Sequence, residues 1–186
     1  EVRRSLDHPP GALVFVSVGR ITRQKNQREL VEAFHEAFGA RASVRLLLVG
    51  GVLEEGAQRE EDRAYGQALR ARLDALGLAD RVQVTGWRRD VPRLLAAGDV
   101  YVQASLWEGS PLAVVEAMAA GLPAVVTDCG GVLPEFRTGV HGWVIPAGDR
   151  AQLAAALQAA AALSPEARAG MGARAAELAV GSYDAA

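Results

Sequence analysis

Leu13-Val14-Phe15-Val16-Ser17-Val18-Gly19-Arg20 is the stretch that best indicates how this chain folds. Its first six residues form a nearly continuous apolar run, which is typical of a β-strand covered on both faces. Gly19 allows the chain to turn, and Asn26 is a plausible N-cap for a helix whose apolar residues recur at helical spacing as far as Phe38. A strand buried on both faces and followed by a helix favours a parallel α/β sheet.

The same alternation of strand and helix continues along the chain. We expect further strands at 44–49, 81–85, 99–104, 122–127 and 142–145, and helices at 59–77, 91–97, 111–119 and 150–180, the last broken at Ser164-Pro165. Repeated units of this kind form parallel sheets with right-handed crossovers. The fold class predicted is therefore α/β, a Rossmann-like doubly wound parallel sheet of about six strands with helices on both faces.

The segment Glu108-Gly109-Ser110-Pro111-Leu112-Ala113-Val114-Val115-Glu116 joins a predicted strand to a predicted helix. Ser110 is a good N-cap and Pro111 a good first helical residue. The first amides of a helix have no internal partners, and the helix dipole is positive at that end. The amides of Gly109, Ser110, Leu112 and Ala113 could therefore receive an anion such as a diphosphate.

The two acids of this segment are candidate binding residues. Glu116 lies among apolar helix neighbours, where an unpaired acid facing a core would be costly, so we expect it to line a cleft or to hold a polar partner. A surface-facing Glu116 is the alternative. Glu108 precedes the helix, and its alternative interpretation is an exposed loop acid.

Two cations follow the first strand, at the sheet edge where open α/β folds bind ligands. Arg20 can grip two phosphate oxygens with its planar fork, whereas Lys25 acts as a mobile point charge. The alternative is that both are merely solvated. Trp87 follows another strand at this edge, so its ring or the nearby backbone could border a nucleotide base, or the ring could pack on the helix at 91–97.

Taken together, these motifs resemble the GT-B glycosyltransferases, in particular the retaining, nucleotide-sugar-dependent enzymes of family 4. The Gly19-Arg20 and Lys25-Asn26 pairs resemble the family's phosphate-gripping loop, and Glu108 to Glu116 resembles its acid-x7-acid signature. The resemblance runs from about Ala12 to Asp149. The stretch that usually follows is matched by Gly121-Leu122-Pro123-Ala124-Val125-Val126-Thr127-Asp128, Gly130-Gly131, Pro134-Glu135, Gly139, Gly142 and Pro146.

The resemblance implies a role for each matching residue. Arg20 and Lys25 would bind the donor's diphosphate, Glu108 would contact the transferred sugar, and Glu116 would accept hydrogen bonds from the ribose. It also implies that no metal or other cofactor is needed, and His8, His35 and His141 are dispersed in the sequence. The catalytic candidates are Arg20, Lys25 and Glu108. The nucleotide-sugar-binding candidates are Gly19, Arg20, Lys25, Trp87, Glu108, Gly109, Ser110, Leu112, Ala113 and Glu116.

Length and composition indicate one domain. The chain has 186 residues, half of them hydrophobic, which suffices for one core. We expect residues 1–11 to be a linker or N-terminal extension and 12–186 to form the nucleotide-sugar-binding domain. By resemblance, the acceptor-binding N-terminal domain of the same polypeptide is absent from the chain. The chain alone should then bind a UDP-, GDP- or ADP-sugar without turning it over.

Charge and cysteine content narrow the partners. A net charge of −2 gives no basic footprint for nucleic acid. A single cysteine excludes an internal disulfide, and a cytoplasmic setting fits, although membrane association of a longer protein stays open. Three other interpretations remain: a sugar-nucleotide epimerase of related fold, a non-catalytic nucleotide-binding or interaction module, and a plain flavodoxin-like or regulatory α/β domain.

Overall fold

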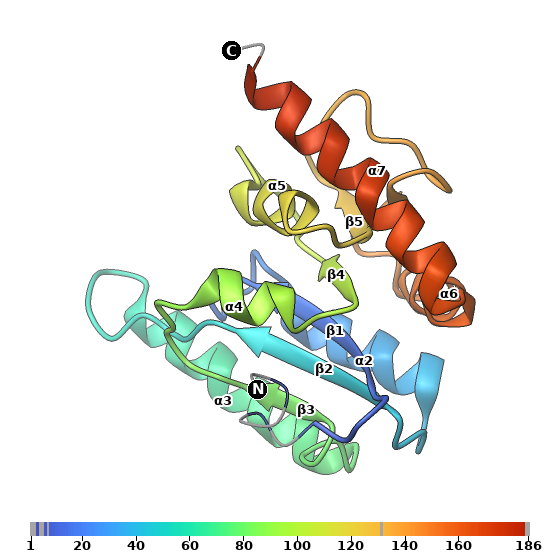
Figure 1. Ribbon diagram of the computed structural model, residues 1–186. Coiled ribbons are helices and arrows are strands. Elements are labelled where there is room, and N and C mark those ends of the chain that lie inside the picture. Colours follow the sequence, from blue (N-terminus) through green and yellow to red (C-terminus); the bar gives the residue numbers. More distant parts are fainter. Residues whose placement is uncertain (1–2, 4–5, 7, 131, 185–186) are drawn as a thin grey trace.

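The computed structural model describes residues 3, 6, 8–130 and 132–184. Six parallel strands form one sheet in the order β3-β2-β1-β4-β5-β6, and helices cover both of its faces (Figure 1). The strands are β1 (Leu13–Val18), β2 (Val44–Val49), β3 (Val82–Val84), β4 (Val100–Gln103), β5 (Ala124–Asp128) and β6 (Gly142–Pro146). The helices are α2 (Gln27–Phe38), α3 (Arg59–Ala75), α4 (Val91–Ala96), α5 (Leu112–Ala119), α6 (Arg150–Ala162) and α7 (Pro165–Asp184). This arrangement confirms the predicted doubly wound α/β fold.

Two hydrophobic cores lie on the two faces of the sheet. On one face α2, α3 and α6 pack together, and the Phe15 ring of β1 lies 5.6 Å from that of Phe38 and 6.4 Å from that of Phe34. On the other face α4, α5 and α7 cover Val14 and Val16. Because successive side chains of a strand point to opposite faces, β1 needs apolar residues at consecutive positions to fill both cores.

The strand order places the start of a crevice between β1 and β4. From β1 the chain crosses to β2 on one side, and from β4 it crosses to β5 on the other, so the connections diverge at the carboxyl ends of these neighbouring strands. Open α/β sheets bind ligands at such a switch point. The loops at 19–26 and 104–111 border it, and both contain residues singled out in the sequence.

The predicted caps of two helices differ from the structure. Asn26 is the N-cap of α2, but it has a left-handed backbone with φ 55° and its side chain makes no capping hydrogen bond. The prediction for Ser110 is wrong: α5 begins at Leu112, Pro111 occupies the N-cap, and no side chain caps the helix. Pro111 has φ −81° and ψ 68°, so its backbone is not helical and α5 begins one residue later than predicted.

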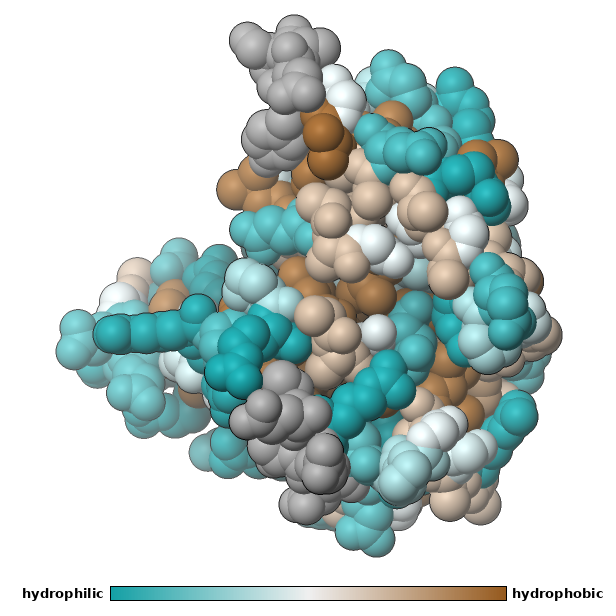
Figure 2. Space-filling view, viewed as in Figure 1, coloured by the Kyte–Doolittle hydropathy of each residue, from teal (hydrophilic) through white to brown (hydrophobic). Residues whose placement is uncertain are grey.

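The loop between β2 and α3 projects beyond the carboxyl edge of the sheet (Figure 1). Figure 2 shows that this projection is mainly hydrophilic. Its residues 54–58 are exposed. A polar loop at this edge leaves the crevice bordered by groups that can hydrogen-bond to a ligand.

Candidate functional site

Lys25 and Glu108 form an ion pair at the carboxyl edge of the sheet. The Lys25 Nζ lies 2.6 Å from the Glu108 Oε1, and the side chains are 22% and 6% exposed, respectively. The interpretation of Glu108 as an exposed loop acid is therefore wrong. The Lys25 stem runs past Gly19, where a Cβ would approach the Lys25 Cε to 3.2 Å, so a residue without a side chain gives this lysine its path.

Residues at the ends of β4 and β5 hold Glu108 in place. Its Oε1 also accepts hydrogen bonds from the Ser105 Oγ at 2.6 Å and the Gln103 Nε2 at 3.4 Å. The Thr127 Oγ1 donates to the Ser105 carbonyl at 2.6 Å, and Ser105 and Thr127 are both buried. No described residue donates to the other carboxylate oxygen, Oε2. That oxygen therefore remains available to accept a further hydrogen bond.

These supporting residues were missed in the sequence. Gln103 lies near the end of the predicted strand at 99–104, Ser105 follows that strand, and Thr127 ends the predicted strand at 122–127. The only signal available was the presence of hydroxyl and amide side chains at strand ends, where an apolar residue would suit a buried position. Their function is visible only once β4 and β5 are seen to be neighbours.

Arg20 lies on the same loop as Lys25 but faces a different environment. Its carbonyl accepts a hydrogen bond from the Gln27 Nε2 at 2.7 Å, which fixes the backbone after β1. In the described part of the chain no carboxylate pairs with its guanidinium. The side chain lines a cavity of about 330 Å³ at the carboxyl edge. Arg20 thus offers an unpaired cation close to the switch point.

The amides at the start of α5 are only partly available to an anion. The Leu112 N–H donates to the Ser110 carbonyl at 2.9 Å, so the expectation of an open amide at Leu112 is wrong for this structure. The amides of Gly109, Ser110 and Ala113 donate to no backbone carbonyl among the described residues. The short turn at 110–112 uses one donor and leaves the other three without a backbone acceptor among the described residues.

Glu116 is exposed on α5. It has no ion-pair partner in the ranges that the structure describes, and its exposure fits both an open cleft and the surface-facing alternative. Its position nevertheless relates to the site, because it acts on the buried phenol of Tyr101 in β4. The pKa of Tyr101 is raised by burial above all, and the negative charges of Glu108 and Glu116 raise it further.

Trp87 also lies at the carboxyl edge, with 58% of its surface exposed. Its indole N–H donates to the Val52 carbonyl at 3.1 Å, and the ring lies against Gly51, where a Cβ would be 3.0 Å from it. The ring thus packs on the loop after β2. One face of an aromatic side chain stays open beside the crevice.

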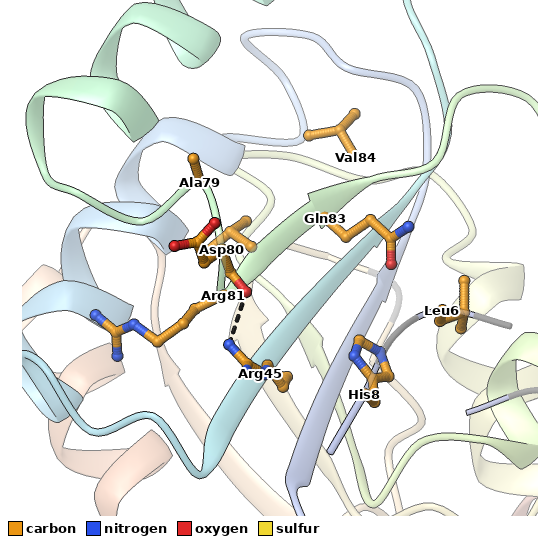
Figure 3. Close-up of a pocket in the computed structure, with 9 residues that line it drawn as sticks. Leu6, His8, Arg45, Ala79, Asp80, Arg81, Gln83 and Val84 are labelled. Atoms are coloured by element: carbon orange, nitrogen blue, oxygen red, sulfur yellow. Dashed lines mark hydrogen bonds between the residues drawn. The ribbon is translucent and has the colours of Figure 1, made fainter. Parts of the chain in front are cut away.

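A separate cavity of about 420 Å³ lies near the amino-terminal ends of β2 and β3 (Figure 3). Arg45 lines it and donates to the Asp80 carbonyl at 2.6 Å, while His8 and Leu6 border it from the segment before β1. This cavity is at the opposite edge of the sheet from Lys25 and Glu108. None of the predicted site residues lines it.

Potential metal ligands are scattered. Within the described residues no group of three or more His, Cys, Asp or Glu side chains is arranged to hold a metal ion. No helix in that same part of the chain is long and apolar enough to span a bilayer.

Fold and site together define a Rossmann-like domain with a group of charged residues at the β1–β4 switch point. The family model of the glycosyl transferases group 1 matches residues 12–162. The chain belongs to this family, and its fold is that of the C-terminal domain of a GT-B glycosyltransferase.

Relatives of known name include two bacterial enzymes. The UDP-Gal:alpha-D-GlcNAc-diphosphoundecaprenol alpha-1,3-galactosyltransferase of Escherichia coli is 32% identical over 141 residues, which cover 74% of this chain and 34% of that enzyme. The lipopolysaccharide core biosynthesis glycosyltransferase LpsE of Rhizobium meliloti is 32% identical over 156 residues, covering 84% of this chain and 42% of the relative. The chain thus spans less than half the length of these relatives.

Solved structures show the same fold. HepE of Anabaena in complex with UDP and glucose superposes with a TM-score of 0.85 at 26% identity, over 97% of this chain and 46% of HepE. The C-terminal domain of a glycosyl transferase group 1 family protein, LpcC of Francisella tularensis, gives a TM-score of 0.83 at 20% identity over 96% of this chain and 90% of that domain. The second likeness concerns the fold alone.

Proposed function

We propose that this chain is the donor-binding domain of a glycosyltransferase that moves a sugar from a nucleoside diphosphate to an acceptor with retention of configuration. The observation that carries the proposal is the grouping of the Lys25–Glu108 pair, the unpaired Arg20 and the open amides of α5 at one switch point. The complex of HepE with UDP and glucose supports it and makes UDP the first nucleotide to test.

The cations of the site suit a diphosphate leaving group. An ammonium has three N–H donors, so Lys25 can keep its bond to Glu108 and still donate to phosphate oxygens. Arg20 can add a two-pronged contact from the same loop. Charge that develops on the departing diphosphate would then meet preorganised donors, and electrostatic stabilisation of this kind often contributes more to catalysis than any other effect.

The two acids would bind hydroxyl groups on either side of the diphosphate. The Oε2 of Glu108 would accept from a hydroxyl of the transferred sugar, since Oε1 is already occupied by Lys25 and Ser105. Glu116 would accept from the ribose and Trp87 would border the base. Gly19 would serve by leaving room for Lys25.

We also propose that an N-terminal acceptor domain of the same polypeptide completes the cleft. The share of HepE that this chain covers, 46%, supports a second domain of similar size. Residues 1–11 would then be a linker or extension before the domain at 12–186. Nucleotide sugars are supplied in the cytoplasm, which is where we propose that the domain acts. Alone, the domain should bind nucleotide without sugar transfer.

Calorimetric titration of the chain with UDP, GDP, ADP and UDP-glucose tests the proposal. Half a cleft that supplies on the order of 5 to 6 kcal/mol predicts a Kd near ~0.1 mM for the matching nucleotide. Lys25→Ala and Arg20→Ala should each weaken binding by about 1.5 to 3 kcal/mol, the value of a hydrogen bond to a charged group.

Arg70→Ala is the matched control, because Arg70 is an exposed cation on α3 outside the site. Thermal unfolding of each variant separates lost binding from lost folding, which matters for Lys25 because Glu108 is buried beside it. The assignment would be contradicted if the wild-type chain bound no nucleotide at concentrations of several millimolar. It would also be contradicted if the Lys25→Ala and Arg20→Ala variants bound nucleotide as tightly as the wild type.

A further inference from the structure

A cavity next to the proposed donor site has features that the donor does not use. This cavity of about 330 Å³ lies at the carboxyl edge, between the loop after β1, the first turn of α3 and the loop after β4. Its volume is at the lower end of the range found for small-molecule sites. The residues that matter here are Arg20, Arg23, Gln24, Glu61, Asp62 and Trp107.

Asp62 is the first observation that points to a ligand. The residue is only 5% exposed, yet its Oδ2 atom is buried without a hydrogen-bond partner among the described residues. Arg20 and Arg23 line the same cavity, but no ion pair links either of them to this carboxylate within the described ranges. A buried carboxylate oxygen is costly without a donor, so the cavity is built to receive a group that donates hydrogen bonds.

Trp107 is the second observation. Its surface is 53% exposed, although the loop that carries it is held firmly. The Leu106 N–H donates to the Gln24 carbonyl at 2.8 Å, and the Gln24 Nε2 donates to the Trp107 carbonyl at 3.0 Å. These two bonds join the loops after β1 and β4. They fix an open indole at the wall of a polar cavity, where it can pack on the apolar face of a ring.

The charges of the cavity balance. Two arginines, Arg20 and Arg23, face two carboxylates, Glu61 and Asp62. A second phosphate would meet the carboxylates and a free cation would meet the arginines, so neither is favoured. A neutral molecule with many hydroxyl groups can donate to Asp62 and Glu61, accept from Arg23 and from Gln24, and stack on Trp107. A pyranose sugar has both the hydroxyl groups and the apolar ring face that these contacts require.

We propose that this cavity binds a neutral saccharide unit of the acceptor. The inference rests on the proposed function, because it places this sugar beside the diphosphate at Arg20, the residue that borders both. The donor's own sugar is assigned to Glu108 and the start of α5, and none of those residues lines the cavity. The donor-binding domain therefore contributes to acceptor selection through Asp62 and Trp107.

The test uses ¹⁵N-labelled 186-residue chain in the presence and absence of saturating UDP. Neutral monosaccharides of the gluco, galacto, manno, fuco and xylo series, with N-acetylglucosamine and N-acetylgalactosamine, are titrated while the Trp107 indole and Asp62 amide signals are followed. At least one sugar should shift both signals with or without UDP. Asp62→Asn should weaken that sugar about tenfold, as expected for the loss of a hydrogen bond to a charged group, and leave UDP affinity within about twofold.

Glu60→Gln is the matched control, because Glu60 lies in the same turn of α3 but is exposed and does not line the cavity. It should bind both sugar and UDP like the wild type. Trp107→Ala is a second test, which does not alter α3. It should also weaken sugar binding and leave UDP affinity unchanged.

The outcomes separate this inference from the proposed function. If UDP binds but no sugar in the series moves the two signals, the cavity is not a saccharide site and the donor assignment stands. If UDP-glucose moves them and free sugars do not, the cavity belongs to the donor and the inference is overturned. Sugar binding without nucleotide binding would leave a saccharide site in a domain whose proposed donor role has failed.

Discussion

At the scale of single residues, the environment of Glu108 shows how a loop carboxylate becomes a positioned group. Lys25 supplies the opposite charge, and Ser105 and Gln103 supply neutral donors to the same oxygen. A buried ion pair is tolerated only when further hydrogen bonds satisfy it, and removing one partner leaves an uncompensated charge. The sequence motifs identified Lys25 and Glu108 as candidate site residues but did not predict that they form an ion pair, because 83 positions separate them in the chain.

His141 makes folding stability depend on pH. Its Nδ1 accepts a hydrogen bond from the Arg137 N–H at 3.0 Å, which requires the neutral ring. Burial, followed by the charges of Arg174 and Arg137, lowers the pKa of His141 below its usual value. The unfolded chain therefore takes up this proton first. Stability should decline as the pH falls below about 6.5 and level off below the lowered pKa of the folded state.

The measurement is the Tm between about pH 7.5 and about pH 5.5 for the wild type and for His141→Gln. The glutamine variant, which cannot titrate, should lose less of its Tm across this range. Between about pH 7.5 and 8.5 the histidine is neutral in both states, so there the two curves should run parallel. Equal losses on acidification in both proteins would show that other groups cause the dependence.

At the scale of elements, helix starts are where local sequence rules succeeded least. The rules expect Ser110 to cap α5 and Asn26 to cap α2 by side chain, and neither side chain does so. Asp149 at the start of α6 does, since it accepts from the Gln152 N–H at 2.9 Å. The loops before α2 and α5 are joined to each other, because the Leu106 N–H donates to the Gln24 carbonyl at 2.8 Å. Such a long-range contact can override a local capping preference.

Two alanine substitutions compare these helix starts. Ser110→Ala should leave the free energy of unfolding within about 0.5 kcal/mol of the wild type, because an exposed side chain without a capping bond is removed. Asp149→Ala should lower the Tm clearly, because the first turn of α6 loses its acceptor. Hydrogen bonds from Gln152 lower the pKa of Asp149, so this difference should be present at neutral pH and vanish as the pH falls through that lowered pKa. A larger loss of unfolding free energy for Ser110→Ala would show that Ser110 does cap α5, as the sequence predicted.

The packing of α7 gives a second prediction at this scale. A Cβ at Gly172 would lie 1.9 Å from the Gly121 carbonyl oxygen, so α7 approaches the turn after α5 too closely for a side chain. Gly172→Ala should cost about 1 to 3 kcal/mol of unfolding free energy, as overpacking does. Gly170→Ala is the control on the same helix, where the nearest atom is the Arg174 Nη1 at 3.7 Å.

The control should be neutral or stabilising by up to about 1 kcal/mol, because alanine is the better helix former. Urea unfolding followed by circular dichroism measures both variants. A Gly172→Ala protein as stable as Gly170→Ala would mean that α7 can move away from the turn after α5 without loss of stability. The close approach would then not be needed to hold α7 on the sheet.

At the scale of the whole molecule, the sheet order explains why chemically active residues collect at one edge. With β1 and β4 adjacent, the loops that follow them meet, and the loop before α3 closes the same edge from the β2 side. The opposite edge carries the cavity bordered by Arg45 and His8, where none of the predicted residues lies. It is at the edge of Lys25 and Glu108 that we propose a second domain to complete the cleft.

Local patterns in the chain were enough to predict the fold class, the order of strands and helices, and the family. Those properties follow from local patterns, such as the apolar run at 13–18, which predicts a strand, and the break at Ser164-Pro165, which separates two helices. Only the folded arrangement revealed that Glu108 is buried against Lys25, that Ser105 supports it, and that Asp62 lines a cavity with Trp107. The reason is physical: these groups come from different elements, and strand order, which is a long-range property, sets which of them meet.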